Sequence, residues 1–308
     1  MRTTGDCGGA HAAAGCLVKG ISVMNLNVRY VSKFLAGIMC LSFVVVPATS
    51  GGAELKKETQ QAWDAYIRTA NSQMADRTNG PFLWVDEVPD RSHSLHNGKI
   101  LVSPIGQQNP KPVPSGLIHD WIGAAFIPDA KLDDVLSAAR DYGHYKEFYK
   151  PNVVDSKSLG TAGACDKYSM LLANHEAVAS TVLKGEYEAC YHQLDDRRWY
   201  SIAHTTRVQE IRRYAQPGAQ ELPSDQGSGY IWRIYSFARF EERDGGVYVE
   251  LEVIVLSRDI PVAVRWVVNP IVRSVSKNAM LTSLRQMEEA VDSTVGTANG
   301  IAKPSHQP

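Results

Sequence analysis

The chain has 308 residues, of which 44% are hydrophobic and 21% charged, and its 32 Lys and Arg against 33 Asp and Glu leave a formal net charge of −1. This is the composition of a globular protein, and it excludes a disordered or collagen-like chain. Because the balanced charge shows no general basic bias, we expect no nucleic-acid partner.

An export signal is expected near the start of the chain. Two basic residues, Arg29 and Lys33, precede an apolar run over residues 34–46, and small residues follow as far as Ala53. The run is shorter than the roughly 20 apolar residues that a spanning helix needs, so a cleaved signal within residues 1–53 is favoured over a permanent anchor. We therefore expect a periplasmic or secreted protein, which would be membrane-anchored if the signal were retained.

The same region bears on the start of translation and on the cysteines. Residues 1–23 add nothing that a signal needs, whereas Met24 lies at a suitable distance before the basic residues, so we expect translation to start at Met24. Of the five cysteines, only Cys165 and Cys190 would remain after cleavage. In an oxidising compartment they could form a disulfide, or each could be a small buried apolar side chain. No CxxC motif or nearby pair of histidines accompanies them, so we expect neither a metal site nor a cofactor.

Residues 54–115 read as an N-terminal helix followed by a Pro-rich connection. Apolar residues recur at helical spacing over residues 54–76, which predicts an amphipathic helix. A strand is expected at 82–85. Several prolines and glycines then indicate an irregular connection, interrupted by a short strand at 100–102.

The next region begins as a strand at 117–127 and a helix at 130–142, with an aromatic-rich helical turn at 145–149. The apolar period then changes from 3.6 to 2, which indicates an antiparallel meander. Its expected strands are 153–159, 167–173, 177–187, 198–213, 230–241 and 246–257. A helix over 261–293, broken or bent at Pro270, closes the region.

Several short segments in this order carry a family resemblance. They are Trp121-Ile122-Gly123, Phe126-Ile127-Pro128, Asp141-Tyr142, Tyr149-Lys150-Pro151, Thr206-Arg207-Val208, Trp232-Arg233, Asp244-Gly245-Gly246-Val247-Tyr248 and Leu256-Ser257-Arg258-Asp259-Ile260-Pro261. Over about residues 116–292 the chain resembles the START-like superfamily of StAR-related lipid transfer-like and polyketide cyclase-like proteins, as a bacterial exported member. The resemblance implies an α+β helix-grip fold, in which a curved antiparallel sheet wraps around the long C-terminal helix, here with an N-terminal helical extension. Residues 293–308 would form a flexible tail.

The resemblance also implies a cavity between the sheet and the C-terminal helix for a hydrophobic small molecule or lipid. Known members include transfer proteins, cyclases and hydrolases, so the fold alone does not choose the activity. Binding, sequestration or carriage without chemistry is favoured, and transient contact with a membrane is compatible with it. Movement of residues 141–149 is expected to gate the cavity. The oligomeric state is left open.

Two other functions remain as alternatives. The first is a cyclase- or hydrolase-like enzyme, in which His204, Arg207 or Tyr235 does acid–base work inside the cavity. The second is a non-catalytic interaction protein with a filled cavity and an exposed apolar patch near Trp63 or Trp84. His119 and Asp120 are not expected to act as a catalytic pair, because neighbours on a strand point to opposite faces. We therefore name no catalytic residue.

Candidate ligand contacts come from the sheet and the last helix. Arg207 could hold a carboxylate or phosphate, or it could form an ion pair with Glu250 or Glu252 that closes the sheet. Trp232 and Phe240 share the strand face that is expected to point inward. The expected ligand-binding residues are Arg207, Trp232, Tyr235, Phe240, Met280, Leu284 and Met287.

Overall fold

The computed structural model of the protein describes residues 52–174 and 181–298. Most of the expected export signal, the expected start at Met24 and the chain beyond residue 298 lie outside these residues. Within the described ranges, we find no helix with the length and apolar character that crossing a membrane requires.

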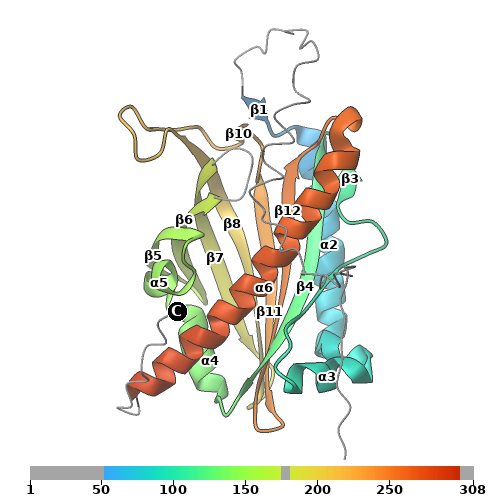
Figure 1. The fold of residues 1–308 in the computed structure, drawn as a ribbon, viewed down its shortest axis with the longest axis vertical. Coiled ribbons are helices and arrows are strands. Elements are labelled where there is room, and N and C mark those ends of the chain that lie inside the picture. Colours follow the sequence, from blue (N-terminus) through green and yellow to red (C-terminus); the bar gives the residue numbers. More distant parts are fainter. Residues whose placement is uncertain (1–51, 175–180, 299–308) are drawn as a thin grey trace, which may run out of the picture. The chain divides into compact units, whose positions relative to one another are not determined.

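A curved antiparallel sheet forms the centre of the fold (Figure 1). Its strands follow the order β2-β4-β12-β11-β8-β7-β6-β5, with β3 paired to β4 and β9 paired to β8. Their bounds are β2 Leu101–Pro104, β3 Lys111–Val113, β4 Gly116–Pro128, β5 Val153–Ala162, β6 Cys165–Asn174, β7 Thr181–Gln193, β8 Arg198–Arg212, β9 Gln220–Glu221, β11 Arg233–Arg243 and β12 Gly246–Arg258. A separate pair joins β1 (Ala53–Glu54) to β10 (Gln226–Gly227). The predicted meander is confirmed.

Strand β12 shows how the sequence gives the sheet two buried faces. Val249 and Val253 point to the concave face, whereas Tyr248 packs in the core on the convex face. The turn before β12 places Asp244 at φ 56° and Gly245 at φ 82°, which suits a tight hairpin. Alternation along the strand therefore supplies apolar side chains to both sides of the sheet.

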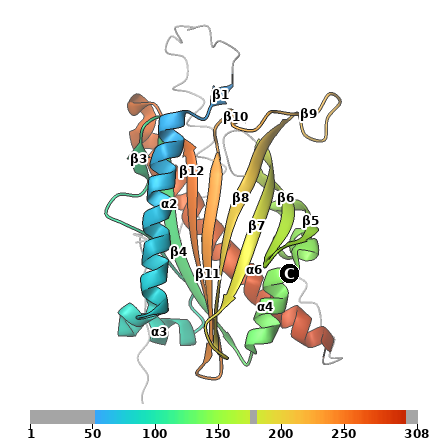
Figure 2. The same cartoon turned by 180° about the vertical axis from the view of Figure 1, so that it is seen from behind.

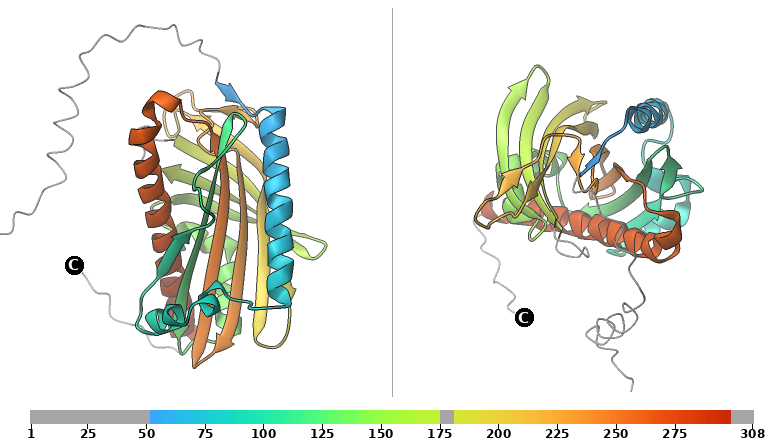
Figure 3. Two further views of the ribbon diagram at one scale, coloured as in Figure 1. Left: turned by 90° about the vertical axis from the view of Figure 1, so that its right-hand side faces the viewer. Right: turned by 90° about the horizontal axis from the view of Figure 1, so that it is seen from above.

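Helices cover both faces of this sheet, as the front, back and turned views show (Figures 1, 2 and 3). Helix α6 crosses the concave face, and α2 runs along the convex face. The helical bounds are α2 Lys57–Thr78, η2 Trp84–Glu87, α3 Pro89–His96, α4 Leu132–Arg140, η3 Tyr142–His144, α5 Tyr145–Phe148, η4 Val262–Val264 and α6 Arg265–Ala298. This is the expected α+β helix-grip arrangement with an N-terminal helical extension, and that prediction is confirmed.

Residues 54–115 fold as part of the same compact unit as the rest of the described chain. Helix α2 confirms the predicted helix, and β2 confirms the predicted short strand. Strands β2 and β3 both pair with β4, with Leu101 opposite Ala124, so this segment extends the central sheet. Residues 54–115, which fall outside the family resemblance, are therefore an integral part of the folded domain.

The strand expected at 82–85 is wrong, because this stretch enters the 3₁₀ turn η2. The backbone N–H groups of Trp84 and Val85 each donate to the carboxylate of Glu250, at 2.9 Å. A buried side chain from β12 thus satisfies backbone donors that a neighbouring strand would otherwise pair.

Helix α6 approaches the sheet closely at Gly123. A Cβ at this position would lie 2.7 Å from Leu284 Cδ1 and 2.9 Å from Met280 Cγ, so the glycine permits the contact. The helix continues through Pro270 and ends at Ala298, beyond its predicted end. Pro270 does not interrupt the helix. As the sixth residue of α6 it lacks the one N–H that would bond to the carbonyl of Trp266.

Candidate functional site

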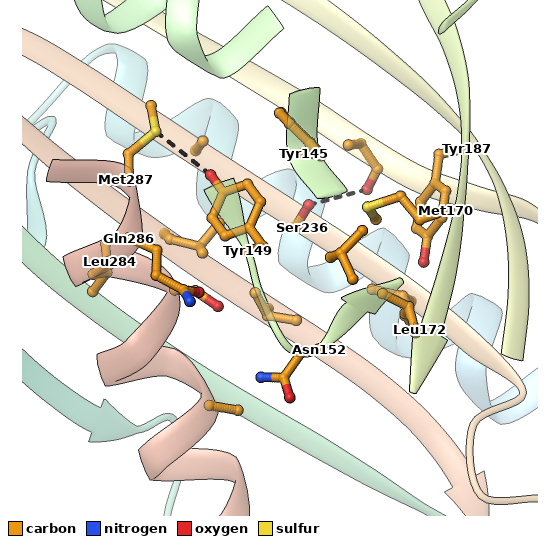
Figure 4. Close-up of a pocket in the computed structure, with 18 of the residues that line it drawn as sticks. Tyr145, Tyr149, Asn152, Met170, Leu172, Tyr187, Ser236, Leu284, Gln286 and Met287 are labelled. Atoms are coloured by element: carbon orange, nitrogen blue, oxygen red, sulfur yellow. Dashed lines mark hydrogen bonds between the residues drawn. The ribbon is translucent and has the colours of Figure 1, made fainter. Parts of the chain in front are cut away.

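A cavity of about 460 Å³ lies between the concave face of the sheet and α6 (Figure 4). Side chains from β5 to β8, β11 and β12 form one wall, and residues 275–287 of α6 form the other. The segment from Ala139 to Val153 closes one side. The volume lies within the range of small-molecule pockets in proteins.

On β11 and β12, the side chains that line the sheet wall are mostly aliphatic or small. On β11, every second residue faces the cavity, and these residues are Ile234, Ser236, Ala238 and Phe240. On β12 the lining residues are Val249, Leu251 and Val253. Strand alternation places the lining residues of each strand on one face, and for β11 this is the face that the sequence predicts to point inward.

Tyrosines dominate the part of the cavity wall that η3, α5, β6 and β7 form. The six that gather there, called the tyrosine cluster below, are Tyr142, Tyr145, Tyr149, Tyr168, Tyr187 and Tyr191. The ring of Tyr168 stacks between two others: its centroid lies 4.2 Å from that of Tyr142 and 4.9 Å from that of Tyr187, with planes 8° from parallel in both pairs. A stacked ladder of three rings therefore links η3 to β6 and β7.

Hydrogen bonds hold part of the tyrosine cluster and leave part of it free. Tyr145 and Tyr191 both donate to the carbonyl of Ala139. The Tyr149 hydroxyl is directed at the sulfur of Met287, 3.6 Å away (Figure 4). Among the described residues, the hydroxyls of Tyr168 and Tyr187 have no hydrogen-bond partner, although both tyrosines line the cavity. These two hydroxyls are available to a bound molecule.

The cavity offers no formal charge. None of the described residues that line it is Asp, Glu, Lys, Arg or His. Burial raises the pKa of Tyr191 to about 12 and raises the pKa of Tyr187 and Tyr149 above their usual range, so all three stay neutral at pH 7.

The carboxylate of Asp166, which contacts the tyrosine cluster through Tyr142, is already compensated. Asp166 accepts a hydrogen bond from the Tyr142 hydroxyl at 3.1 Å and pairs with Arg140 at 3.0 Å. This hydrogen-bonded pair, with Asp166 buried, raises the pKa of Arg140. Neither charged side chain belongs to the cavity lining.

The structure places Phe240, Leu284 and Met287 in the cavity wall, as expected. Met280 is not part of the wall. It packs instead in the core of the concave face, where α6 meets Gly123. Whether the three lining residues contact a ligand stays a prediction.

Arg207 does not face the cavity. Its side chain is 50% exposed, and its Nη1 lies 3.8 Å from the carboxylate of Glu186. The pairing of β7 with β8 shifts between Glu186 and Tyr187, which leaves Thr206 as an extra residue. Such a bulge reverses the alternation along the strand, so Arg207 turns outward.

Glu250 and Glu252 do form ion pairs within the sheet, as considered above, but their partner is Arg239 and not Arg207. Arg239 Nε lies 3.1 Å from Glu250, and Nη2 lies 3.2 Å from Glu252. All three side chains are buried on the convex side of the sheet. This group therefore belongs to the structure under α2 rather than to the cavity.

Trp232 and Tyr235 also lie outside the cavity lining. Trp232 precedes β11, so the alternation of that strand does not extend to it, and it packs in the convex-side core. Tyr235 points to α2, where its hydroxyl donates to Asn71 at 2.9 Å. His204 stacks against Tyr235 with centroids 5.9 Å apart. The alternative in which His204, Arg207 or Tyr235 does acid–base work inside the cavity is therefore contradicted for these three residues.

His119 and Asp120 have separate partners, as their positions on one strand require. His119 lies 2.9 Å from the Ser257 hydroxyl, and burial lowers its pKa to about 4. Asp120 accepts a hydrogen bond from Tyr66 of α2 at 2.7 Å. Burial, with the charge of Glu252 in addition, raises the pKa of Asp120 to about 7.

Cys165 of β6 and Cys190 of β7 form a disulfide. They are directly opposite each other in the strand register. Of the two states that the sequence left open, the structure therefore shows the linked one.

Sequence reasoning missed the tyrosine cluster as a site. Tyr187 and Tyr191 share one face of a predicted strand, and Tyr168 lies on the strand before it. Tyr145 and Tyr149 repeat at the spacing of one helical turn. These spacings were the available signal, but only the pairing of β6 with β7 brings the rings together.

A scan against protein-family models finds no match, and a search of curated proteins finds none either. Solved structures similar to this chain include a STAR-related lipid transfer protein from Xanthomonas axonopodis, with 17% identity, 62% of this chain and 98% of that chain covered, and a TM-score of 0.41. The Zhui aromatase/cyclase from Streptomyces sp. R1128 has 10% identity, with 60% and 99% covered and a TM-score of 0.41. Human STARD10 has 7% identity, with 65% and 76% covered and a TM-score of 0.40.

Proposed function

We propose that the protein binds an uncharged, largely apolar small molecule or lipid in this cavity and sequesters or carries it without chemical change. The observation that carries the proposal is a cavity of about 460 Å³ whose described lining has no charged side chain. An apolar guest gains roughly 25 cal/mol for each Å² that it buries. A charged group would lose its hydration there without a compensating partner.

The free hydroxyls of Tyr168 and Tyr187 support a guest with a polar group at one end. A hydroxyl or carbonyl oxygen on the guest would pair with them and replace the water that otherwise solvates them. Ser236, which also lines the cavity, donates to Ala203 and is thus already engaged. The polar end of the guest would therefore lie against the tyrosine cluster and its apolar part against β11, β12 and α6.

Binding is favoured over catalysis by the chemistry of the lining. Acid–base catalysis at neutral pH is most efficient with a group whose pKa lies near the working pH. In the described part of the chain, the ionisable side chains that line the cavity are tyrosines. Burial raises the pKa of Tyr149, Tyr187 and Tyr191, which moves them further from neutral pH. The interaction-protein alternative lacks support, because the cavity is not filled, Trp63 is buried and Trp84 is half-buried.

The segment over residues 142–149 is proposed as the gate. Tyr145 and Tyr149 line the cavity, and Phe148 packs against the core of the concave face. The contact from this segment to Met287 of α6 is a long hydrogen bond to sulfur, which is weak. Opening this segment would uncover the cavity without breaking the sheet.

We also propose that the protein is exported. The proposal rests on the basic and apolar pattern of residues 29–53. The disulfide between Cys165 and Cys190 supports it, because such bonds persist in oxidising compartments and are rare in the cytosol.

Native mass spectrometry of protein purified from the exported fraction tests the proposed function. We expect a stoichiometric neutral guest that organic extraction releases. Ala238→Phe, which fills the cavity, should lose this guest, whereas Ala75→Phe on the exposed surface of α2 should keep it. An unliganded mass that stays unchanged after incubation with a mixed lipid extract would contradict the proposal.

A further inference from the structure

Four donor atoms converge at the end of the sheet that carries the turn between β11 and β12. The Tyr248 hydroxyl lies 2.6 Å from His96 Nε2 and 3.1 Å from Asp244 Oδ2, and these two atoms are 3.8 Å apart. The Oγ of Ser92 lies 3.1 Å from the same hydroxyl. Ser92 and His96 belong to α3, which Figure 1 shows at this end of the sheet. These four residues are called the α3 cluster below.

The α3 cluster is separate from the cavity. None of its four residues lines the cavity wall. The ring of Tyr248 is buried in the core on the convex face of the sheet, and its hydroxyl meets α3. The side chains of His96 and Asp244 stay 35% and 55% exposed. A cation could therefore reach the donor atoms from solvent without entering the cavity.

The spacing of the donors resembles that of ligands around one metal ion. Imidazole nitrogen and carboxylate oxygen lie about 2.0 to 2.2 Å from zinc, which places neighbouring ligand atoms about 3.0 to 3.4 Å apart. The separations among His96 Nε2, Asp244 Oδ2 and the Tyr248 hydroxyl are 2.6, 3.1 and 3.8 Å, so they bracket this range. Small side-chain shifts would therefore let all three bind one ion, with Ser92 Oγ beside them.

Packing holds these donors in place. The His96 ring lies against Phe126, with centroids 4.2 Å apart, and Phe126 lies against Tyr248 at 4.8 Å. Asp244 belongs to the tight turn and has φ 56°. Ligands that the surrounding structure already orients lose little freedom when they bind a metal.

Charges beside the α3 cluster favour a cation. The guanidinium of Arg243 donates to Asp86, at 3.1 Å from Nη1, and it lies 3.5 Å from the carboxylates of both Glu241 and Asp244. Three carboxylates thus share one guanidinium, so negative charge exceeds positive charge among these four side chains. A bound divalent ion would compensate this excess.

We propose that the α3 cluster binds a transition-metal ion, and that it binds copper(II) most tightly. Imidazole nitrogen suits copper, nickel and zinc, and among divalent ions of the first row the affinity of a nitrogen and oxygen site is highest for copper. Magnesium and calcium prefer sites made of oxygen alone. The Tyr248 hydroxyl loses its proton to solvent on binding and His96 binds as the neutral imidazole, so the affinity rises with pH. The ion links α3 to β12 and the turn before it.

This proposal departs from the expectation of no metal site. That expectation rested on the spacing of cysteines and histidines along the chain. His96 and Tyr248 are 152 residues apart, so no local motif contains both. The fold brings these donors together by placing α3 at the end of β12.

Titration of the purified protein with Cu²⁺ against a competing chelator tests the site. We expect the wild type to bind Cu²⁺ and to develop visible absorption from charge transfer between the phenolate and copper. His96→Ala should weaken binding about tenfold or more, because it removes the nitrogen ligand. Tyr248→Phe should abolish the absorption. His93→Ala is the matched control: His93 is exposed on the same helix, contacts Asn97, and should change neither result.

Urea denaturation with and without Cu²⁺ gives a second readout. An ion that binds the folded state stabilises it, so the unfolding midpoint should rise with Cu²⁺ in the wild type and in His93→Ala, and much less in His96→Ala. Should Tyr248→Phe fail to fold, the exposed His96 still carries the test.

Three outcomes would overturn the site. The first is a wild type that shows no charge-transfer absorption with Cu²⁺. The second is equal weakening by His93→Ala and His96→Ala, which would mean adventitious binding to surface histidines. The third is competition by Mg²⁺ as strong as that by Zn²⁺, since the imidazole of His96 would then not be a ligand.

Discussion

The ring of Tyr142 stacks on the ring of Tyr168, with centroids 4.2 Å apart and planes 8° from parallel. Tyr142 belongs to η3 and Tyr168 to β6, so this stack attaches the proposed gate to the sheet. The hydrogen bond from the Tyr142 hydroxyl to Asp166 reinforces it. The same two rings line the cavity, so the contact that attaches the proposed gate to the sheet also shapes the site.

Loosening this stack should speed release of the guest. Tyr142→Leu removes the ring contact and the hydrogen bond to Asp166. We expect the release rate to rise about fivefold, which corresponds to the free energy that one aromatic pair contributes. Stopped-flow transfer of a neutral fluorescent guest to acceptor vesicles measures the rate. Tyr235→Leu removes a tyrosine ring from the convex side and should leave the rate unchanged. Equal rates in wild type and Tyr142→Leu would argue against the gate.

Removing the free hydroxyls should weaken binding of a guest that bears an oxygen. Tyr168→Phe and Tyr187→Phe each delete one available donor while keeping the stacked rings. We expect the dissociation constant to rise about threefold to tenfold for each, which is the net worth of one hydrogen bond. Tyr200→Phe, outside the cavity lining, is the control for fluorescence titration. Unchanged affinity in both cavity variants would show that the polar group of the guest lies elsewhere.

The buried ion pairs of Arg239 should matter more for stability than the exposed pair of Arg207. Arg239→Leu leaves Glu250 and Glu252 buried without their cation, which we expect to lower the free energy of unfolding by about 3 to 5 kcal/mol. Arg207→Leu should change it by less than about 1 kcal/mol, because that pair is exposed and long. Urea denaturation compares the two variants. A similar loss in both would be inconsistent with the assignment of the buried cation to Arg239.

Asp120 should make the protein less stable as the pH rises toward neutrality. Its pKa, about 7 in the folded protein, exceeds its ordinary value of 3.8, so between these values the folded state binds more protons than the unfolded state. This contribution is complete below pH 4 and is lost as the pH rises through 7. His119 acts in the opposite sense, because its pKa is lowered to about 4.

Asp120→Asn isolates the first effect, since the amide keeps an acceptor for Tyr66 and does not titrate. Relative to the wild type, we expect the variant to gain on the order of 4 kcal/mol between pH 4 and pH 8, because a pKa difference of about 3 units corresponds to about that free energy. Urea denaturation at a series of pH values gives the difference directly. Parallel pH profiles for the two proteins would rule out titration of Asp120 in this window.

Local alternation predicts most of the sheet because each strand buries one or both faces. It fails where a residue far away in the sequence determines the backbone conformation. Residues 82–85 have the apolar pattern of a strand, yet the carboxylate of Glu250 captures the N–H groups of Trp84 and Val85. Nothing in the sequence near residue 82 indicates that partner.

The site was predictable only in part, for a related reason. The positions of Phe240, Leu284 and Met287 follow from strand and helix periodicity, which extends without interruption to the cavity. Arg207 lies beyond the bulge at Thr206, and one extra residue is enough to turn it outward. The tyrosine cluster depends on the register of two strands and the packing of a helical segment against them, neither of which local periodicity indicates.

The central claim, a cavity for uncharged guests, is tested most directly by a matched pair of competitors. A neutral fluorescent probe bound in the cavity is displaced by a long-chain alcohol or by the carboxylate of equal length, at a pH where the acid is ionised. We predict that the alcohol competes at least about tenfold better, because the described lining offers no counter-charge to the carboxylate. Equal competition by the two, or tighter binding of the carboxylate, would contradict the account.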